Sequence, residues 1–423
     1  MSEADREKAI IAGLTAESGE AALDFADRSL DELAELAEAA GAMVVGRALQ
    51  HRQAPDPATF LGKGKLEATT RSADAVGATT LICDDELSGS QIRNIENLTG
   101  LKVVDRTFLI LDIFAQRAKS REGQLQVELA QQQYRLSRLI GLGQALSRLG
   151  GGIGTRGPGE SQLESDRRHI NRRISTLKRA LAEVATRRDQ TRKQRQSQDI
   201  LTLAVVGYTN AGKSTLINAL CQSDLLALDQ VFAPLDPAAR RRGLPDQQPV
   251  ILIDTVGFIR KLPHQLVDAF RSTLEEVTQA DAIIHVLDAS DPQAEIQRDV
   301  VDLLLNELGA GGKPRLTVLN KVDLLGPFER SGLHGLTGKE EPQLVSARTG
   351  EGLPDLITAI ARLAAEQFIP VDLVLPYDKT GWISRIEQQG KIESIEYTEA
   401  GIQVKARVRP ALFHPLQREI NKR

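Results

Sequence analysis

The residues best suited to chemistry form one short segment, GYTNAGKS at positions 207–214. The segment fits the pattern G-x-x-x-x-G-K-[ST], follows an apolar run at 201–206 and precedes the helical run TLINALCQ. In such a loop, backbone N–H groups and the start of the next helix bind phosphate oxygens. We expect the Lys213 ammonium to lie against the β- and γ-phosphates and the Ser214 hydroxyl to bind Mg²⁺. The sequence therefore predicts a nucleoside triphosphate site.

Three further motifs follow along the chain, each at the end of an expected strand. In DTVG, at 254–257, the Asp would hold Mg²⁺ through water and the Gly amide would sense the γ-phosphate. In NKVD, at 320–323, the last carboxylate can accept hydrogen bonds from guanine N1–H and the 2-amino group, a pattern that adenine does not match. SAR, at 346–348, fits the loop whose backbone contacts guanine O6. One such motif is weak, because a strand-end Asp can simply cap a helix, but four in order resemble the translation-factor-like GTPases.

These motifs define the candidate site. We expect Lys213 and Gly257 to act in catalysis, and Ser214 and Asp254 to bind the metal. The loop FAPLDPAAR, at 232–240, is the candidate switch I. The expected nucleotide-binding residues are Gly207, Tyr208, Thr209, Asn210, Ala211, Gly212, Lys213, Ser214, Thr215, Phe232, Ala233, Pro234, Leu235, Asp236, Asp254, Thr255, Val256, Gly257, Asn320, Lys321, Val322, Asp323, Ser346, Ala347 and Arg348.

Two positions of this site depart from what GTP hydrolysis ordinarily uses. Phe258 follows Gly257, where many GTPases place a Gln that orients the attacking water. An apolar side chain cannot do this, so we expect hydrolysis to be slow alone and completed by a partner or by backbone groups. In switch I, a Thr hydroxyl would ordinarily close the Mg²⁺ shell, but Pro234 stands at its expected position.

Composition sets the class of protein. At 423 residues the chain is expected to form two to four domains. With 41% hydrophobic and 26% charged residues it is typical of a globular protein, and its apolar runs are far shorter than the roughly 20 residues of a membrane helix. The charged N-terminus has no apolar signal core, so we expect a cytoplasmic protein. The two cysteines, Cys83 and Cys221, are expected to be buried reduced thiols.

Periodicity predicts the elements that position these residues. Within 1–105, strands are expected at 43–49, 78–85 and 101–106, alternating with helices near 29–40, 64–75 and 88–99. Strict β/α alternation returns at 200–365, with strands within 201–207, 250–257, 281–289, 315–323 and 343–347. The last segment, 366–423, reads as a small strand-rich domain. An α/β fold is therefore expected for both larger parts.

Between these parts, apolar residues spaced by three and four over 125–139 and 163–184 predict two long helices in an antiparallel hairpin. The connection GGGIGTRGPGES, at 150–161, is either a ligand-contacting loop or a flexible connector. Positions 156–195 hold twelve basic and five acidic residues, a net of +7, whereas 1–40 have a net of −8. A basic element of this kind suggests contact with nucleic acid, with a solvated helix face as the alternative.

Several longer segments resemble the HflX family of ribosome-associated GTPases: FLGKGKLE (60–67), DDELSGSQIRNIE (84–96), QLQVELAQQQYRLSRL (124–139), GGGIGTRGPGESQLESDRR (150–168) and DTVGFIRKLP (254–263). The resemblance implies a P-loop NTPase G domain at 198–366, an N-terminal α/β domain at 1–106, a helical hairpin at 107–197 with the loop 150–160, and a small C-terminal α+β domain at 367–423. It implies a monomer in the cytoplasm, with a role in stress response. That protein would bind the large (50S) subunit and split stalled or idle 70S ribosomes, contacting ribosomal RNA through the hairpin. It also allows weaker binding of ATP.

The chain departs from this family in switch I. The family pattern is close to FATLDPT, whereas this chain has FAPLDPA, so the Mg²⁺-coordinating Thr has no counterpart at Pro234. Proline has neither a hydroxyl nor a backbone N–H, which affects switch closure and hydrolysis more than nucleotide binding. Three hypotheses follow: a ribosome-splitting GTPase, a GTPase of large-subunit assembly or RNA modification, and a GTP-dependent RNA binder with little turnover.

Overall fold

The computed structural model describes residues 6–16, 19–149, 158–197, 200–221, 239–245, 249–261, 271–333, 341–366, 368–408, 412–413 and 415–417. They form two compact units. One contains the described residues up to position 185 together with 256–261 and 271–275, and the other contains the remainder. The segment that follows the DTVG strand therefore belongs to the same unit as the N-terminal domain.

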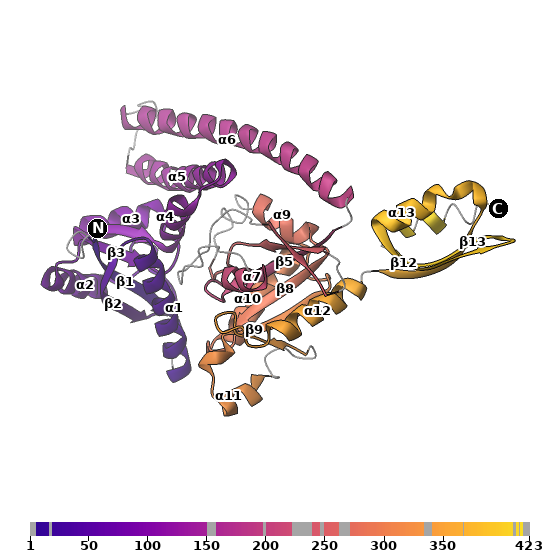
Figure 1. Ribbon diagram of the computed structural model, residues 1–423. Helices are drawn as coiled ribbons and strands as arrows, with labels where there is room; N and C mark the ends of the chain where they lie inside the picture. The colour runs from indigo at the N-terminus through magenta and orange to yellow at the C-terminus, as the bar shows by residue number, and fades with distance from the viewer. Residues whose placement is uncertain are drawn as a thin grey trace. The chain divides into compact units, whose positions relative to one another are not determined.

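The N-terminal domain is a doubly wound parallel sheet with the strand order β2-β1-β3-β4. Its strands are β1 (Lys8–Thr15), β2 (Met43–His51), β3 (Thr80–Cys83) and β4 (Lys102–Asp105). Helices α1 (Glu20–Ala39) and α4 (Arg106–Arg117) cover one face, and α2 (Lys63–Val76) and α3 (Gly89–Thr99) cover the other (Figure 1). The expected α/β domain is confirmed, but β1, one of the two inner strands, was missed, because its short apolar run AIIAGL supports a strand or a helix equally well.

Local sequence explains where these helices begin and end. Ser88 caps α3: its hydroxyl accepts from the Gln91 N–H, and the Gln91 side chain accepts from the Ser88 N–H. Asp105 caps α4 by accepting from the Phe108 N–H. Gly77 and Gly100 end α2 and α3 in the left-handed region, which glycine adopts without steric cost. The helices that follow β3 and β4 at the carboxyl ends of these strands therefore each begin at a side-chain cap, Ser88 for α3 and Asp105 for α4.

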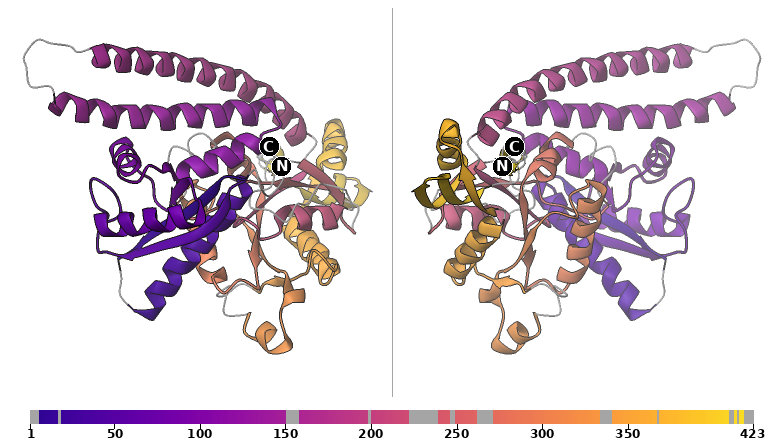
Figure 2. Two further views of the ribbon diagram at one scale, coloured as in Figure 1. Left: turned by 90° about the vertical axis from the view of Figure 1, so that its left-hand side faces the viewer. Right: turned by 90° about the vertical axis from the view of Figure 1, so that its right-hand side faces the viewer.

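The two long helices are α5 (Arg121–Leu149) and α6 (Pro158–Ser197), which run antiparallel side by side (Figure 2). Their seam is the predicted apolar stripe, in which Leu129, Ile174 and Leu177 are buried against each other. An ion pair of 2.6 Å joins Arg173 to Glu128 across the helices. Because α6 begins at Pro158, the last three positions of the expected loop 150–160 are helical, and 150–157 lie outside the described residues.

The second unit contains a six-stranded sheet in the order β10-β9-β8-β5-β7-β6. Its strands are β5 (Leu201–Gly207), β6 (Ala239–Gly243), β7 (Pro249–Asp254), β8 (Ala282–Asp288), β9 (Arg315–Asn320) and β10 (Gln343–Leu344). The five strands that the sequence predicts run parallel, whereas β6 runs antiparallel to β7. Strand β6 was not predicted, and residues 239 and 240, expected in the switch I loop, belong to it. Its three arginines suit an edge strand, because charge there opposes further pairing.

Helices complete the layers of this P-loop fold. Helices α7 (Lys213–Cys221) and α12 (Leu353–Glu366) pack together with the sheet in one apolar core. Helices α9 (Arg271–Gln279) and α10 (Ala294–Glu307) follow β7 and β8 in the chain, and the short α11 (Pro327–Ser331) follows β9. All the loops that carry nucleotide motifs leave the carboxyl ends of parallel strands, where ligands bind in open α/β sheets.

The C-terminal segment forms an antiparallel sheet of β11 (Ile369–Leu375), β12 (Gly390–Thr398) and β13 (Gly401–Val408), in the order β11-β13-β12. Helix α13 (Gly381–Gln389) packs on it around buried Ile386 and Val404. This confirms the expected small α+β domain.

The state of the two cysteines and the polarity of the helices can be compared with what composition predicts. Both cysteines are free thiols, Cys83 fully buried and Cys221 only half-buried, which corrects the expectation for the second. Burial raises the pKa of the Cys83 thiol well above its usual range. Among the described residues, no helix is long and apolar enough to cross a bilayer.

Candidate functional site

The phosphate loop connects β5 to α7 in the predicted strand–loop–helix arrangement. Gly207 ends β5 so close to β8 that a Cβ atom would lie 2.2 Å from the Val286 carbonyl oxygen. Gly212 has φ +87°, and a Cβ there would lie 2.3 Å from Asn320 Nδ2. Both glycines of the motif are therefore required by close approach, and the left-handed backbone at Gly212 adds a second reason.

Lys213 and Ser214 begin α7 and face the loop. Lys213 Nζ donates to the carbonyl oxygens of Gly207 at 3.1 Å and Tyr208 at 2.7 Å. Burial lowers the pKa of Lys213 to about 8. A phosphate group beside this ammonium would reverse the shift by supplying negative charge, so the loop favours an anionic ligand over none. Thr209 and Ala211 are buried, Asn210 is exposed, and Thr215 is half-buried in the first turn of α7.

The two expected metal ligands lie together. Ser214 Oγ donates to Asp254 Oδ2 at 2.6 Å, at the carboxyl end of β7. Burial raises the pKa of Asp254, and its other oxygen, Oδ1, is buried without a hydrogen-bond partner among the described residues. A hydroxyl and an orphaned carboxylate oxygen are hard ligands of the kind that Mg²⁺ prefers. The donor set therefore fits the expected cation, although the described residues contain no cluster of three or more metal-ligating side chains.

Asn320 joins the phosphate loop to the guanine motifs. Its Nδ2 donates to the Ala211 carbonyl at 2.9 Å, and its Oδ1 accepts from the Ala347 N–H at 3.0 Å. Ser346 is fully buried, and its hydroxyl accepts from the Thr349 N–H at 3.1 Å, which shapes the loop 346–348. The phosphate loop and the two guanine motifs are thus tied together by one side chain, although Ala211 and Asn320 lie 109 residues apart along the chain.

The remaining predicted residues take varied positions. Val322 is buried and Asp323 half-buried in the short 3₁₀ helix after β9, while Arg348 is exposed. Thr255 is buried, with its hydroxyl donating to the Val205 carbonyl at 2.7 Å. Val256 and Gly257 are buried after β7. The switch I residues Phe232, Ala233, Pro234, Leu235 and Asp236 lie outside the described residues.

One residue at this edge of the sheet was missed. Asp288, at the end of β8, pairs with Lys321 Nζ at 2.7 Å and accepts at Oδ1 from the Ser290 N–H and hydroxyl, at 3.0 and 2.6 Å. Lys321 has φ +65°, and Asp288 fixes its ammonium. The signal was available, because VLDAS places an Asp at a strand end beside the other motifs. Asp288 therefore joins the candidate site as the residue that orients Lys321.

A buried histidine in the same sheet makes stability depend on pH. Burial lowers the pKa of His285 from 6.5 to about 3, and its Nε2 has no hydrogen-bond partner among the described residues. The unfolded chain binds a proton below pH 6.5 and the folded chain does not, so stability present above that pH is lost towards pH 3. At about 1.4 kcal/mol per unit, wild type should lose about 2 kcal/mol more than His285→Leu between pH 6.5 and 5. Urea denaturation at the two pH values checks this, and parallel losses would contradict it.

Comparison with known proteins agrees with this geometry. Residues 27–115 match the family described as "GTP-binding GTPase N-terminal", and residues 117–195 match "GTP-binding GTPase Middle Region". Residues 202–321 match "50S ribosome-binding GTPase". The three matches cover the N-terminal domain from position 27 onward, most of the hairpin and most of the six-stranded sheet.

Curated relatives span nearly the whole chain. The "GTPase HflX" of Caldanaerobacter subterraneus subsp. tengcongensis is 47% identical over 404 residues, covering 96% of this chain and 91% of the relative. The "GTPase HflX" of Escherichia coli K12 is 42% identical over 386 residues, covering 90% of each. A solved GTP-binding protein from Sulfolobus solfataricus in complex with GDP is 25% identical, with a TM-score of 0.43, covering 84% of this chain and 99% of that one.

Proposed function

The chain belongs to the HflX family of GTPases, and from this premise we propose that it binds the large ribosomal subunit and dissociates stalled or idle 70S ribosomes. It is a P-loop GTPase with a ribosome-binding GTPase domain. The observation that carries the proposal is the presence, in one chain, of a long hairpin with a basic outer face and a nucleotide site. The protein would act in the cytoplasm, where the ribosome, its proposed partner, is found.

The hairpin supplies the surface for ribosomal RNA. The described apolar side chains of the seam pack between the helices, and the described bases of α6 lie in solvent. Arg168 pairs with Glu164 of the same helix, and Arg173 pairs with Glu128 of α5. Phosphate contacts from the exposed bases would make binding fall steeply with salt. From its sequence alone, we include the loop 150–160 with its Arg156 in the proposed RNA-binding surface. The exposed bases over the described side chains of α6 are Arg167, Arg168, Arg172, Arg173, Lys178 and Arg179.

In the nucleotide site, the chain's own residues bind and orient GTP. Lys213 and the loop amides hold the phosphates, Asp323 accepts from guanine, and Asn320 keeps the two halves of the site in register. Mg²⁺ held at Ser214 and Asp254 would neutralise charge that develops on the phosphate oxygens. Gly257 would donate its amide to the γ-phosphate.

Hydrolysis is proposed to be slow without the ribosome. Phe258 is only 2% exposed and offers no polar group to an attacking water. In switch I, Pro234 lacks the hydroxyl that would close the metal shell. The ribosome or backbone groups must then complete the site. The same two residues favour the competing function, a GTP-dependent RNA binder with little turnover.

Phosphate release and sucrose-gradient sedimentation test the proposal together. GTP hydrolysis should rise at least about tenfold on addition of purified 50S subunits, and 70S particles should separate into subunits only with GTP. A variant lacking 150–157, the part of the loop before α6, should keep GTP binding and lose splitting. Unstimulated hydrolysis would favour the RNA binder. Full splitting by the loop deletion, or preference for precursor particles over mature 70S, would contradict the splitting mechanism.

A further inference from the structure

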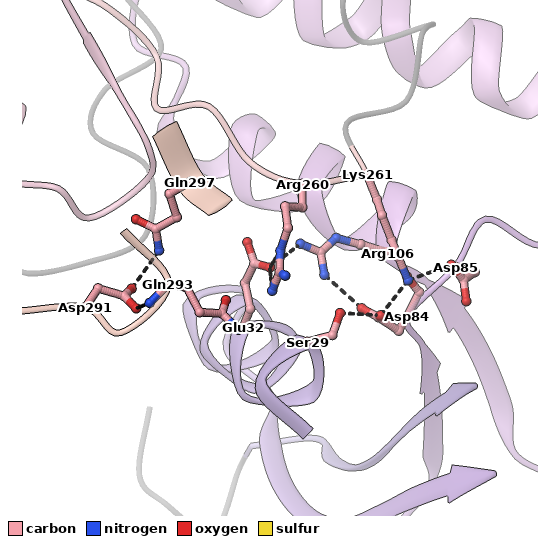
Figure 3. A network of polar contacts seen from close by, with 10 residues as sticks. All are labelled: Ser29, Glu32, Asp84, Asp85, Arg106, Arg260, Lys261, Asp291, Gln293 and Gln297. Atoms are coloured by element: carbon pink, nitrogen blue, oxygen red, sulfur yellow. Dashed lines mark hydrogen bonds and ion pairs between the residues drawn. The ribbon is translucent and has the colours of Figure 1, made fainter. Parts of the chain in front are cut away.

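An ionic cluster in the N-terminal unit holds the segment that follows the DTVG motif; Asp84 and Arg106 are buried, and the side chains of Lys261 and Asp85 are 43% and 36% exposed (Figure 3). Asp84, directly after β3, has a side chain only 4% exposed and accepts from Ser29 Oγ at 2.7 Å and Arg106 Nη1 at 2.8 Å. Lys261 Nζ donates to Asp84 Oδ2 and to Asp85 Oδ1, each at 2.7 Å. Two segments that the sequence singles out, 84–96 and 254–263, thus meet at one carboxylate.

Arg260 is held beside it by a second set of contacts. Its Nη2 lies 3.4 Å from Glu32 Oε2, and its guanidinium lies 5.0 Å from the centre of the Phe25 ring. Glu32 also pairs with Arg106 Nη2 at 3.0 Å, so the two acceptors are bridged by one buried guanidinium. The segment after the DTVG motif is therefore held by two consecutive residues, Arg260 through Glu32 and Lys261 through Asp84.

The place of this cluster in the sheet is the one where ligands bind. In a parallel sheet of order β2-β1-β3-β4, the chain connections change direction between β1 and β3, and ligands bind beyond the carboxyl ends of those strands. The Asp84 N–H donates to the Ala12 carbonyl of β1 at 2.9 Å, which puts its carboxylate at that point. In this protein the group found at that point is the Lys261 ammonium of the same chain, which contacts the Asp84 carboxylate.

The held segment is short and tightly packed. Phe258 and Ile259 are 2% and 1% exposed, and Lys261 has φ +54°, a conformation that non-glycine residues rarely adopt. Such a conformation persists when the surroundings fix it. Only three residues separate Lys261 from Gly257, so contacts made by the bases constrain where the Gly257 amide can lie.

We propose that the N-terminal domain positions the GTPase switch: Asp84, with Glu32 and Asp85, acts through Arg260 and Lys261 to hold the segment 257–261 ready for the γ-phosphate. This rests on the proposed role of Gly257. Because Phe258 contributes no polar group, the backbone of this segment is what remains to meet the γ-phosphate. Fixing it before GTP arrives removes an ordering cost from binding, as preorganised donors do.

The test compares a non-hydrolysable GTP analogue with GDP by calorimetric titration, without ribosomes. Lys261→Met combined with Arg260→Met should weaken analogue binding about tenfold, or 1.4 kcal/mol, and leave GDP affinity within about twofold. Lys261→Arg should retain most of the affinity, because it keeps the cation. Asp74→Asn, which removes an exposed carboxylate from α2 of the same domain, is the matched control and should change neither affinity.

Asp84→Asn probes the same contact from the other side. Added to Lys261→Met, it should weaken analogue binding little further, because one interaction is then already lost. The Lys261 and Arg260 variants keep the test valid if loss of the Asp84 charge beside Arg106 prevents folding. Equal losses for analogue and GDP, tighter analogue binding, or no change in either would overturn the proposal. Ribosome stimulation does not enter the readout, so a failure of the splitting mechanism remains distinguishable.

Discussion

Gly212→Ala is expected to weaken binding of GTP and GDP alike by more than about 100-fold, or 2.7 kcal/mol. The new Cβ would lie 2.3 Å from Asn320 Nδ2, at a residue whose φ of +87° is already costly for any side chain. Relief requires Asn320 to move, which breaks its bonds to Ala211 and Ala347. One methyl group would thereby separate the phosphate loop from the guanine loop. Titration with a fluorescent GDP derivative measures the loss.

Gly243→Ala is the matched control for this variant. Gly243 lies on the edge strand β6, where an added Cβ would meet no described atom within 4 Å and the backbone has no unusual φ. Its nucleotide affinity should equal that of wild type. If Gly212→Ala bound GDP with unchanged affinity, the bridging role of Asn320 would be wrong.

The second large effect concerns the contact between α5 and the end of β4, where Asp105→Asn should destabilise the N-terminal unit by about 3–5 kcal/mol. Asp105 is fully buried and accepts from Tyr134 Oη and Arg138 Nη2, each at 2.6 Å, and from the Leu87 N–H at 3.0 Å. Burial raises the pKa of the Tyr134 phenol, which keeps its proton on the donor side of that bond. The amide would carry no charge for Arg138 and would face these donors with one acceptor oxygen instead of two.

Calorimetry should place the unfolding temperature of Asp105→Asn lower by roughly 10 °C, from about 2–4 °C per kcal/mol for a unit of this size. Asp31→Asn serves for comparison, since it removes a carboxylate from the half-exposed pair with Arg47 in the same unit. Exposed pairs contribute about 0–1 kcal/mol, so its shift should be small. Equal shifts for the two variants would show that Asp105 is not the anchor.

The loops of the candidate nucleotide site could be predicted from sequence because each of their motifs is local. A strand end, a tight loop and a helix start specify 207–214 without reference to the rest of the chain, and NKVD and SAR need only their own strands. Asp288 was missed because a single Asp after a strand has many uses. Its role depends on a neighbour, Lys321, which follows the adjacent strand.

The cluster around Asp84 could not have been predicted, for a different reason. Its partner Lys261 lies 177 residues away, and nothing in either segment specifies the other. Ionic contacts at such a separation follow from the fold as a whole. Strand β1 was missed because a short run of apolar and small residues supports a strand or a helix equally well. The antiparallel strand β6 was missed because its arginines carry no alternation of apolar and polar residues.

The anchoring of the hairpin has a mechanical consequence. Helix α5 has 29 residues and is about 43 Å long at 1.5 Å per residue, and its residues 139–149 form an arm of about 16 Å beyond Arg138. At Arg138, Gly89 of α3 approaches so closely that a Cβ would lie 2.6 Å from the Arg138 carbonyl oxygen, which opposes sliding of α5, and the ion pair of Arg138 with Asp105 opposes its rotation. A force applied at the Leu149 end of α5 would therefore be transmitted through Arg138 and Asp105 to the end of β4 as a turning force. Strand β3 pairs with β4 in the sheet and is followed directly by Asp84, the carboxylate that contacts Lys261.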